Sequence, residues 1–243
     1  MKKLLTIFTI LLAFASASAD NLDSLKQQLK VTMDDSLKAP LYAQIAAEYM
    51  HYDTLSNKVK KMVYQNEAII NSYQGLRLFS RYSDTTGMRV CFDNLAHVYH
   101  DQKKYSQAKW YILQSNNLSR LKNDVPNIIT SLLKLAAIKT DIKDYSLAMR
   151  DLNEALALSN AQKSATTEAV VQKNYAKLYT KMNKKSKAAL SLKKSKSITD
   201  SVRLSNAKAL AKINAPDTSK AKKKYTAAKK VIKVSPSKKL AAI

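Results

Sequence analysis

The hydrophobic positions between residues 88 and 197 repeat with a period of forty residues. Each copy begins with an apolar run that holds an alanine, and a second run follows about twelve residues later. The first runs read Leu95-Ala96 with Tyr99, Leu135-Ala136 with Lys139, and Tyr175-Ala176 with Tyr179. The second runs carry Ala108, Ala148 and Ala188, followed by Ile112, Leu152 and Leu192. Spacings of three and four residues mark one face of an α-helix, so each copy predicts two helices joined by a short turn.

Three such helix pairs follow one another along the chain. The expected helices cover about 88–101 and 105–121, then a stretch opening at Asp124–Pro126 and 145–160, then 164–182 and 186–205. Short turns, as at Gln102–Lys104 and Lys143–Asp144, force the two helices of a pair to be antiparallel neighbours. The alanines let the helices approach closely, and Ile112, Leu152 and Leu192 are expected to fill the seam between them. Each pair keeps a second apolar face, which only the next pair can cover.

The spacing before residue 88 is less regular but also helical. One short helix is expected within 21–35, a second from Pro40, and a third that begins after a cap at Asp53 or Thr54. The apolar residues expected on the buried face of this third helix are Val59, Met62, Val63, Ala68 and Ile69. Gly75 is a point where it could be interrupted, and 85–87 predicts a break before the regular repeats. With only two glycines and four prolines in 243 residues, long helices are favoured over hairpins.

With these residues the chain resembles the tetratricopeptide repeat (TPR) family. The resemblance rests on Leu-Ala-x-x-Tyr at 95–99, Tyr-x-x-Ala at 105–108 and 145–148, and Tyr-Ala-x-x-Tyr at 175–179. It covers about 110 residues, with a weaker match, Ile-Ala-x-x-Tyr at 45–49, within 38–69. The period of forty exceeds the family's usual thirty-four, and the family's early Trp, its Gly and its closing Pro are absent. The resemblance implies an all-α solenoid of antiparallel helix pairs whose helices are about one turn longer than usual.

The first nineteen residues have the three-part pattern of a secretory signal. Lys2 and Lys3 precede an apolar stretch over 4–15, and a small-residue site at 17–19 precedes Asp20. We expect export to the periplasm or secretion; an uncleaved membrane anchor is the alternative. A signal followed by a Leu-Asp-Ser-Leu-Lys helix resembles exported repeat proteins of Bacteroidetes-type bacteria. The predicted organisation is a signal peptide (1–19), N-terminal helices with a divergent repeat (20–87), TPR-like repeats (88–213) and a basic tail (214–243).

Positive charge is concentrated in the C-terminal third. The whole chain has a net charge of +24, and the stretch from Lys173 to the end contributes +19 of it. Such asymmetry indicates an anionic partner or surface. The tail is rich in Lys and Ala. If an anionic surface induced a helix there, basic side chains would surround a short apolar strip. The alternative is that the tail only keeps the protein soluble. The residues that would contact an anionic surface are Lys222, Lys223, Lys224, Lys229, Lys230 and Lys233.

The sequence offers little material for chemistry. His97 and His100 lie three residues apart on one expected helix, but no neighbouring motif supplies further ligands, so we predict no metal site. Cys91 is alone in the chain and is expected to pack as a small apolar residue. No phosphate-binding loop, nucleophile elbow or zinc-protease motif is present in the sequence, so we predict neither a cofactor nor an enzyme.

The family resemblance implies that the first helix of each pair lines a concave groove that binds peptides. Carried onto this sequence, the groove candidates are Asn94, His97, His100, Asp101, Lys134, Lys173, Asn174, Lys177 and Lys181. Asn94 and Asn174 match a position at which the family often uses Asn to hold a peptide backbone. Lys173, Lys177 and Lys181 recur every four residues and could receive carboxylates, although a solvated helix face would look the same.

The function predicted from the sequence is a non-catalytic protein-interaction scaffold of the cell envelope. It is expected to bind a peptide or protein segment in its groove, and the lysines there could receive an acidic one. One alternative is an envelope-associated adaptor whose basic tail docks on anionic membrane or polysaccharide. Another is the sensory repeat domain of a signalling system. Export argues against nucleic acid as a partner.

Overall fold

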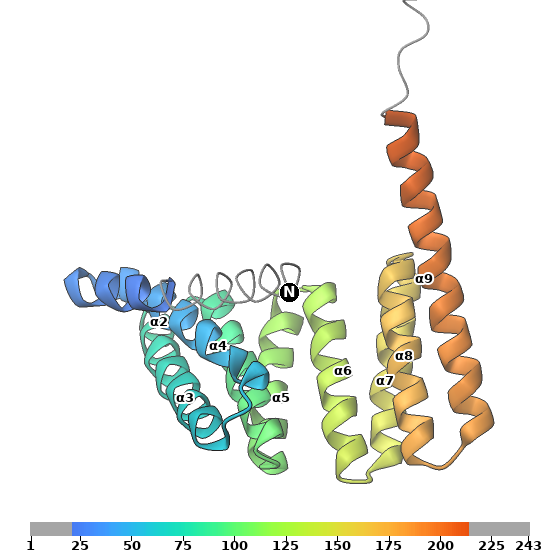
Figure 1. Ribbon diagram of the computed structural model, residues 1–243, viewed down its shortest axis with the longest axis horizontal. Helices are drawn as coiled ribbons and strands as arrows, with labels where there is room; N and C mark the ends of the chain where they lie inside the picture. Colours follow the sequence, from blue (N-terminus) through green and yellow to red (C-terminus); the bar gives the residue numbers. More distant parts are fainter. Residues whose placement is uncertain (1–20, 214–243) are drawn as a thin grey trace, which may run out of the picture. The chain divides into compact units, whose positions relative to one another are not determined.

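The computed structural model describes residues 21–213, and these form helices in succession without a β-strand (Figure 1). Residues 21–31 form a first helical segment. It is followed by α2 (Asp35–Tyr49), the short 3₁₀ turn η1 (Met50–Thr54), α3 (Lys58–Arg81), α4 (Thr85–Asp101), α5 (Tyr105–Leu121), α6 (Val125–Asp141), α7 (Tyr145–Ala161), α8 (Ala165–Lys181) and α9 (Lys185–Ile213). The predicted all-α solenoid of antiparallel helix pairs is confirmed. One compact unit extends to Ile198; a second begins at Thr199, and its described part is the end of α9.

The forty-residue period arises from helices and turns of fixed length. Each helix from α4 to α8 has seventeen residues, and three residues join it to the next. In each turn from α3 to α9 the middle residue has a positive φ, between 52° and 65°: Ser83, Lys103, Asn123, Lys143, Lys163 and Asn183. The amide of the following residue closes the helix end, as when Lys104 N donates to Tyr99 O at 2.8 Å. This is the Schellman arrangement, built here without glycine.

In most of these turns, the residue that follows the positive-φ residue caps the next helix. Asp84, Asp124, Asp144 and Ser164 each accept a hydrogen bond from a first-turn amide of the following helix. The break predicted at 85–87 is therefore wrong, because Asp84 caps α4 and these residues form its first turn. Gly87 meets a different need: a Cβ at this position would lie only 2.3 Å from the Phe79 ring, so α3 and α4 touch there.

The expectations for the N-terminal helices need three corrections. The cap of α2 is Asp34, and Pro40 lies inside this helix rather than at its start. Asn57, not Asp53 or Thr54, caps α3 through a hydrogen bond from Lys60 N, because residues 50–54 are used by the 3₁₀ turn. Gly75 does not interrupt α3; there the Sγ atom of Cys91 would be 3.2 Å from an added Cβ.

The buried seam confirms the small-and-large packing, with one exception. Ile112 packs against Leu135 and Ile138 of α6, and Leu152 packs in the same way against residues of α8. Each seam residue is thus covered by the first helix of the next copy. Leu192 was expected to be equivalent, but it is 55% exposed because it belongs to the last copy that the described residues contain. A charged pair, Lys139 of α6 and Asp151 of α7, is also buried in the described part of the chain.

A second exception concerns α3. Val59, Met62 and Val63 were predicted to face the core, but all three are exposed; Ala68 is buried and Ile69 half-buried.

Among the described residues, no helix is both long and apolar enough to cross a membrane. The tail lysines lie outside the residues that the structure describes, so their predicted role stays a prediction.

Candidate peptide-binding groove

A groove of about 530 Å³ runs across the first helices of the three repeat pairs. It is lined by His100 of α4, by four residues of α6 and six of α8, and by one side chain each from α7 and α9. Every lining residue belongs to the compact unit that ends at Ile198. The groove therefore lies where the predicted first-helix surface should be.

The floor of the groove is apolar. Ala136, Ala137 and Ala176 line it, and their short side chains leave the space open between α6 and α8. Leu152 and the half-exposed Leu192 reach it from the second helices of their pairs. A ligand side chain placed here would contact carbon rather than polar groups.

One wall of the groove is basic. Lys173, Lys177 and Lys181 of α8 line the groove together with Asn174. The three lysines that recur every four residues therefore face the groove. Neither Lys173 nor Lys177 makes an ion pair with any residue in the described part of the chain. The Asn174 amide donates to Val170 O of its own helix at 2.9 Å. Two exposed ammonium groups thus border the apolar floor, and no anionic side chain of the described residues neutralises them.

A carboxylate at the end of the groove links three helices. Asp141 of α6 lies 2.9 Å from Nε2 of His100 on α4 and 3.7 Å from Nζ of Lys181 on α8. Asp141 thereby pairs with Lys181, the last of the three lysines, and connects the first helices of the three repeat pairs.

The remaining candidates are placed differently. His97 and Lys134 line a separate hollow of about 50 Å³ beside the groove, while Asn94 and Asp101 line neither. The Asn94 amide nitrogen is buried without a hydrogen-bond partner among the described residues. Asp101 accepts a hydrogen bond from the buried Tyr52 hydroxyl at 2.7 Å and lies 3.5 Å from His97. The predicted set is thus divided between the groove and the α4 surface.

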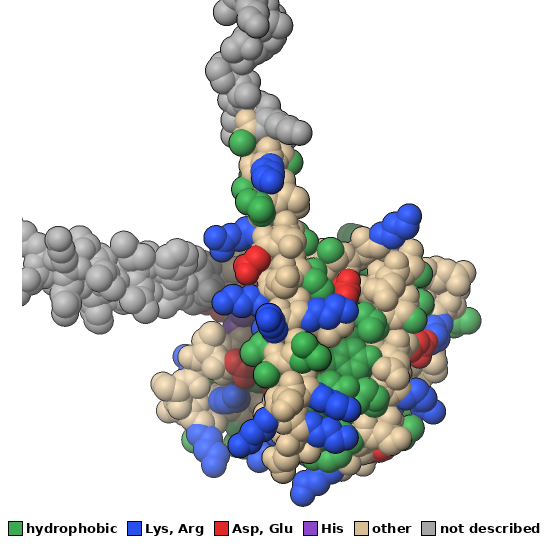
Figure 2. All heavy atoms as spheres, turned by 90° about the vertical axis from the view of Figure 1, so that its right-hand side faces the viewer, with side chains coloured by type: hydrophobic (Ala, Val, Ile, Leu, Met, Phe, Trp, Pro, Cys, Tyr) green, Lys and Arg blue, Asp and Glu red, His purple; other side chains and the backbone are tan. Residues whose placement is uncertain are grey.

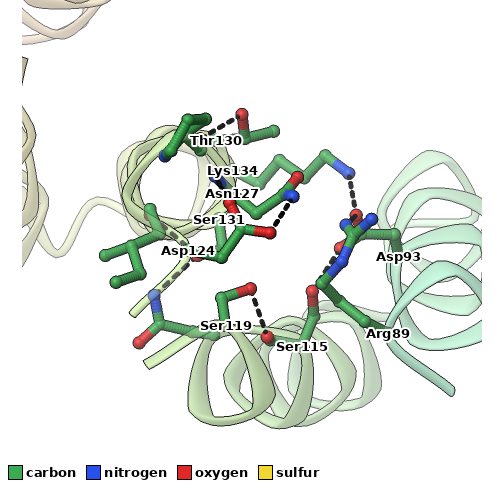
Figure 3. Close-up of polar contacts among 12 residues, drawn as sticks. Arg89, Asp93, Ser115, Ser119, Asp124, Asn127, Thr130, Ser131 and Lys134 are labelled. Atoms are coloured by element: carbon green, nitrogen blue, oxygen red, sulfur yellow. Dashed lines mark hydrogen bonds and ion pairs between the residues drawn. The ribbon is translucent and has the colours of Figure 1, made fainter. Parts of the chain in front are cut away.

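Lys134 of α6 belongs to a polar network with residues of the preceding helices α4 and α5 (Figure 3). Its ammonium lies 3.4 Å from Asp93 Oδ2, which also pairs with Arg89 at 3.1 Å. Ser115 of α5 donates to the other carboxylate oxygen at 2.6 Å. Asp93 therefore joins α4, α5 and α6, and Lys134 is used in the structure rather than left for a ligand.

One group of side chains has the composition of a metal site. Ligand atoms of Asp53, His97 and Asp101 lie within 4.8 Å of one another, all on exposed residues. Both carboxylates already have partners, since Lys61 Nζ is 3.0 Å from Asp53 and Tyr52 donates to Asp101. The sequence did not reveal this cluster, because the fold brings Asp53 to α4 from the turn before α3; that the protein holds no metal stays a prediction.

The cysteine has the environment of a packing residue. Cys91 is fully buried between α3 and α4, and burial raises the pKa of its thiol to about 12. A thiol with such a pKa is almost never ionised near neutral pH, so it is a poor nucleophile.

Figure 2 shows the end of the repeat array at which α9 lies, with hydrophobic side chains gathered beside it and Lys and Arg side chains around them. The groove-lining Leu192 belongs to this helix.

Comparison with known proteins supports the architecture. No known family profile matches the chain, and no curated protein matches it significantly in sequence. Among solved structures, a variant of a putative kinesin light chain from Podospora anserina, described by its nearly identical TPR-like repeats, superposes with a TM-score of 0.63. It is 14% identical, and the match covers 78% of this chain and 90% of that one. The chain has a TPR-like fold.

The apo form of RapI gives a similar result, with a TM-score of 0.61 and 19% identity over 85% of this chain and 74% of that one. At such identities the likeness shows the fold alone. The TPR-like fold explains why the first helices share one surface. It does not account for Leu192, which completes the groove of this chain from a second helix, whereas Asp141 lies on a first helix, where the TPR resemblance implies groove residues. Leu192 escaped prediction as a lining residue because its equivalents, Ile112 and Leu152, are buried.

Proposed function

We propose that the protein is a non-catalytic interaction scaffold whose groove binds an acidic segment of a partner protein. The observation that carries this proposal is the pair Lys173 and Lys177, which border an apolar floor without an ion pair among the described residues. Carboxylates accept charge-assisted hydrogen bonds from ammonium groups, and apolar side chains gain from burial on the alanine and leucine floor. A short acidic stretch with apolar residues satisfies both parts of the groove.

The TPR-like fold supports this reading through its geometry. Repeats stacked in one direction present an extended surface, and here three successive first helices contribute to it. The N-terminal pattern of a secretory signal is our reason for placing this scaffold in the periplasm or outside the cell.

Binding of a defined acidic peptide tests the proposal. The probe is a fluorescent peptide of alternating Glu and Leu with a free carboxyl terminus, titrated with the full chain and followed by anisotropy. We expect saturable binding that weakens as salt is raised, since the attraction is between exposed charges. The variant Lys173→Glu/Lys177→Glu should lose about tenfold or more in affinity, which corresponds to about 1.4 kcal/mol.

The matched control reverses charge on the neighbouring helix. Lys193 and Lys196 of α9 are exposed but do not line the groove. The variant Lys193→Glu/Lys196→Glu should therefore bind the peptide nearly as the wild type does. Equal losses in both variants would show attraction to net charge only, and no loss in the groove variant would overturn the proposal.

A further inference from the structure

The helix α3 exposes an apolar stripe along its outer face. Val59, Met62, Val63, Ile70 and Tyr73 are between 40% and 67% exposed. Their spacings of three, four, seven and eleven residues place them within one arc of the helix. A surface helix normally carries polar residues on this side, so the stripe requires an explanation.

The buried face of the same helix carries polar side chains as well as apolar ones. Gln65, Asn71 and Ser72 are buried there together with Gly75, beside the apolar Ala68, Leu78 and Phe79. On α3, amide and hydroxyl side chains are therefore buried while large apolar side chains are exposed.

The stripe continues onto α5 through aromatic contacts. The Tyr73 ring packs edge-on against that of Tyr111 at 6.2 Å, and Trp110 packs against the same ring at 4.8 Å. The Tyr73 and Tyr111 hydroxyls are hydrogen-bonded to each other. Trp110 and Leu113 are 53% and 39% exposed. We refer to Val59, Met62, Val63, Ile70, Tyr73, Trp110 and Leu113 as the α3–α5 face.

The next second helix lacks this property. On α7 the exposed positions carry Ser146, Arg150, Asn153 and Asn160 together with the small Ala157. The apolar character of the α3–α5 face is therefore not a consequence of the repeat itself. The last described helix, α9, also exposes leucines, among them Leu190 and Leu192.

The two helices that form this face are mostly basic. Across α3 and α5 there are seven Lys and Arg residues and a single acidic residue, Glu67, which is half-buried. Three of the basic residues pair with carboxylates of neighbouring elements, and four have no ion pair among the described residues: Lys58, Lys60, Arg77 and Lys109. Two copies of the chain meeting through this face would bring like charges together, which opposes self-association. Exposed aromatic and aliphatic side chains with a basic rim are instead the features of proteins that lie at a membrane surface.

We propose that the α3–α5 face docks on an anionic lipid surface. The apolar side chains enter the headgroup boundary, and the basic residues of α3 and α5 face the lipid phosphates. A helix of 24 residues, about 36 Å long, offers a long contact with a bilayer. This surface lies on second helices of the pairs, whereas the groove is built mainly from first helices, so the two proposals stand or fall separately.

Trp110 provides a direct probe, because it is the only tryptophan in the chain. The full chain is mixed with vesicles of equal parts phosphatidylglycerol and phosphatidylcholine, with or without brominated acyl chains. We expect a blue shift of Trp110 emission and strong quenching by the brominated lipid, both absent with pure phosphatidylcholine. Residues 1–19 are the same in every sample, and the signal reports only on the surroundings of Trp110.

Matched variants give the test its specificity. Val63→Ser/Ile70→Ser shortens the stripe and should weaken partitioning by about tenfold, as expected for two partly buried aliphatic side chains. Val170→Ser removes an equally exposed valine from α8 and should leave partitioning unchanged. Trp110 emission that does not change when anionic vesicles are added would overturn the proposal, as would equal quenching in both variants. So would a blue shift that depends on protein concentration without lipid, which would indicate a second copy on this face.

Discussion

The second helix pair buries an ion pair where the first pair stacks two tyrosines. Lys139 Nζ lies 2.5 Å from Asp151 Oδ2, and the two side chains are only 9% and 6% exposed. At the corresponding positions of the first pair, the rings of Tyr99 and Tyr111 stack at 5.5 Å. Burial raises the pKa of the Asp151 carboxyl even though Lys139 and Arg150 lower it. The ionised form of Asp151 therefore loses more free energy through desolvation than it gains from its basic neighbours.

Removing one partner should be far more damaging than removing both. Lys139→Met leaves a buried carboxylate and Asp151→Leu a buried ammonium, and each should lower the unfolding free energy by about 3–5 kcal/mol. The double variant has no buried charge and keeps similar side-chain volume. It should be as stable as the wild type or more stable, by up to about 4 kcal/mol.

The pH dependence has a definite sign. Because the folded-state pKa of Asp151 is raised above its unfolded value, its contribution to stability is fully present below the unfolded pKa. That contribution is lost as pH rises through the folded-state pKa. The decline toward neutral pH should steepen in Lys139→Met, where the carboxylate has lost its buried partner, and should disappear in the double variant.

Urea unfolding followed by far-UV circular dichroism measures these effects in the wild type, both single variants and the double variant, at neutral and mildly acidic pH. The double-mutant cycle should give a large favourable coupling between the two substitutions. Single effects that add to within about 0.5 kcal/mol, or a Lys139→Met variant as stable as the wild type at neutral pH, would refute the reasoning.

Three further predictions concern the helix ends. Gly87→Ala should destabilise by about 1–3 kcal/mol, because the new methyl group overlaps the Phe79 ring; an unchanged urea midpoint would contradict the close contact. Asp124→Ala should cost about 1 kcal/mol. The Asn127 side chain lowers the pKa of the Asp124 carboxyl, so this cap contributes above the unfolded pKa and is lost as pH falls; the variant should show a flatter acid limb in thermal melts. Lys143→Gly should raise the melting temperature, since glycine adopts the φ of 65° without the steric cost of about 1–2 kcal/mol, and a lower melting temperature would argue against that strain.

The repeat architecture could be predicted from the sequence because its signals are local. The alanine and leucine spacing indicated the helices, and the caps at Asp124 and Asp144 lie where the turns end. The stretch 85–87 was misleading because a glycine after two threonines is typical of a break. Here the glycine is required by its close approach to Phe79 of the preceding helix. No local pattern reports a contact of this kind, since it depends on how two helices pack.

The candidate site was predictable only in part. The helical spacing of Lys173, Lys177 and Lys181 placed them on one face of a helix, and the TPR resemblance implied that this face lines the groove, where the structure has them. The role of Leu192 depends on the end of the repeat array, and the stripe on α3 depends on which face of that helix meets its neighbours. Helical periodicity shows that two faces exist, but it does not state which one is buried when both carry apolar residues.

A charge-exchange experiment tests the central claim, acidic-segment binding in the groove, most directly. The full chain and its variant Lys173→Glu/Lys177→Glu are each titrated into the Glu-Leu peptide and into a matched Lys-Leu peptide. We predict that the wild type prefers the acidic peptide and that the variant reverses this preference, because the two side chains border the same apolar floor in both proteins. An unchanged preference in the variant would contradict the account.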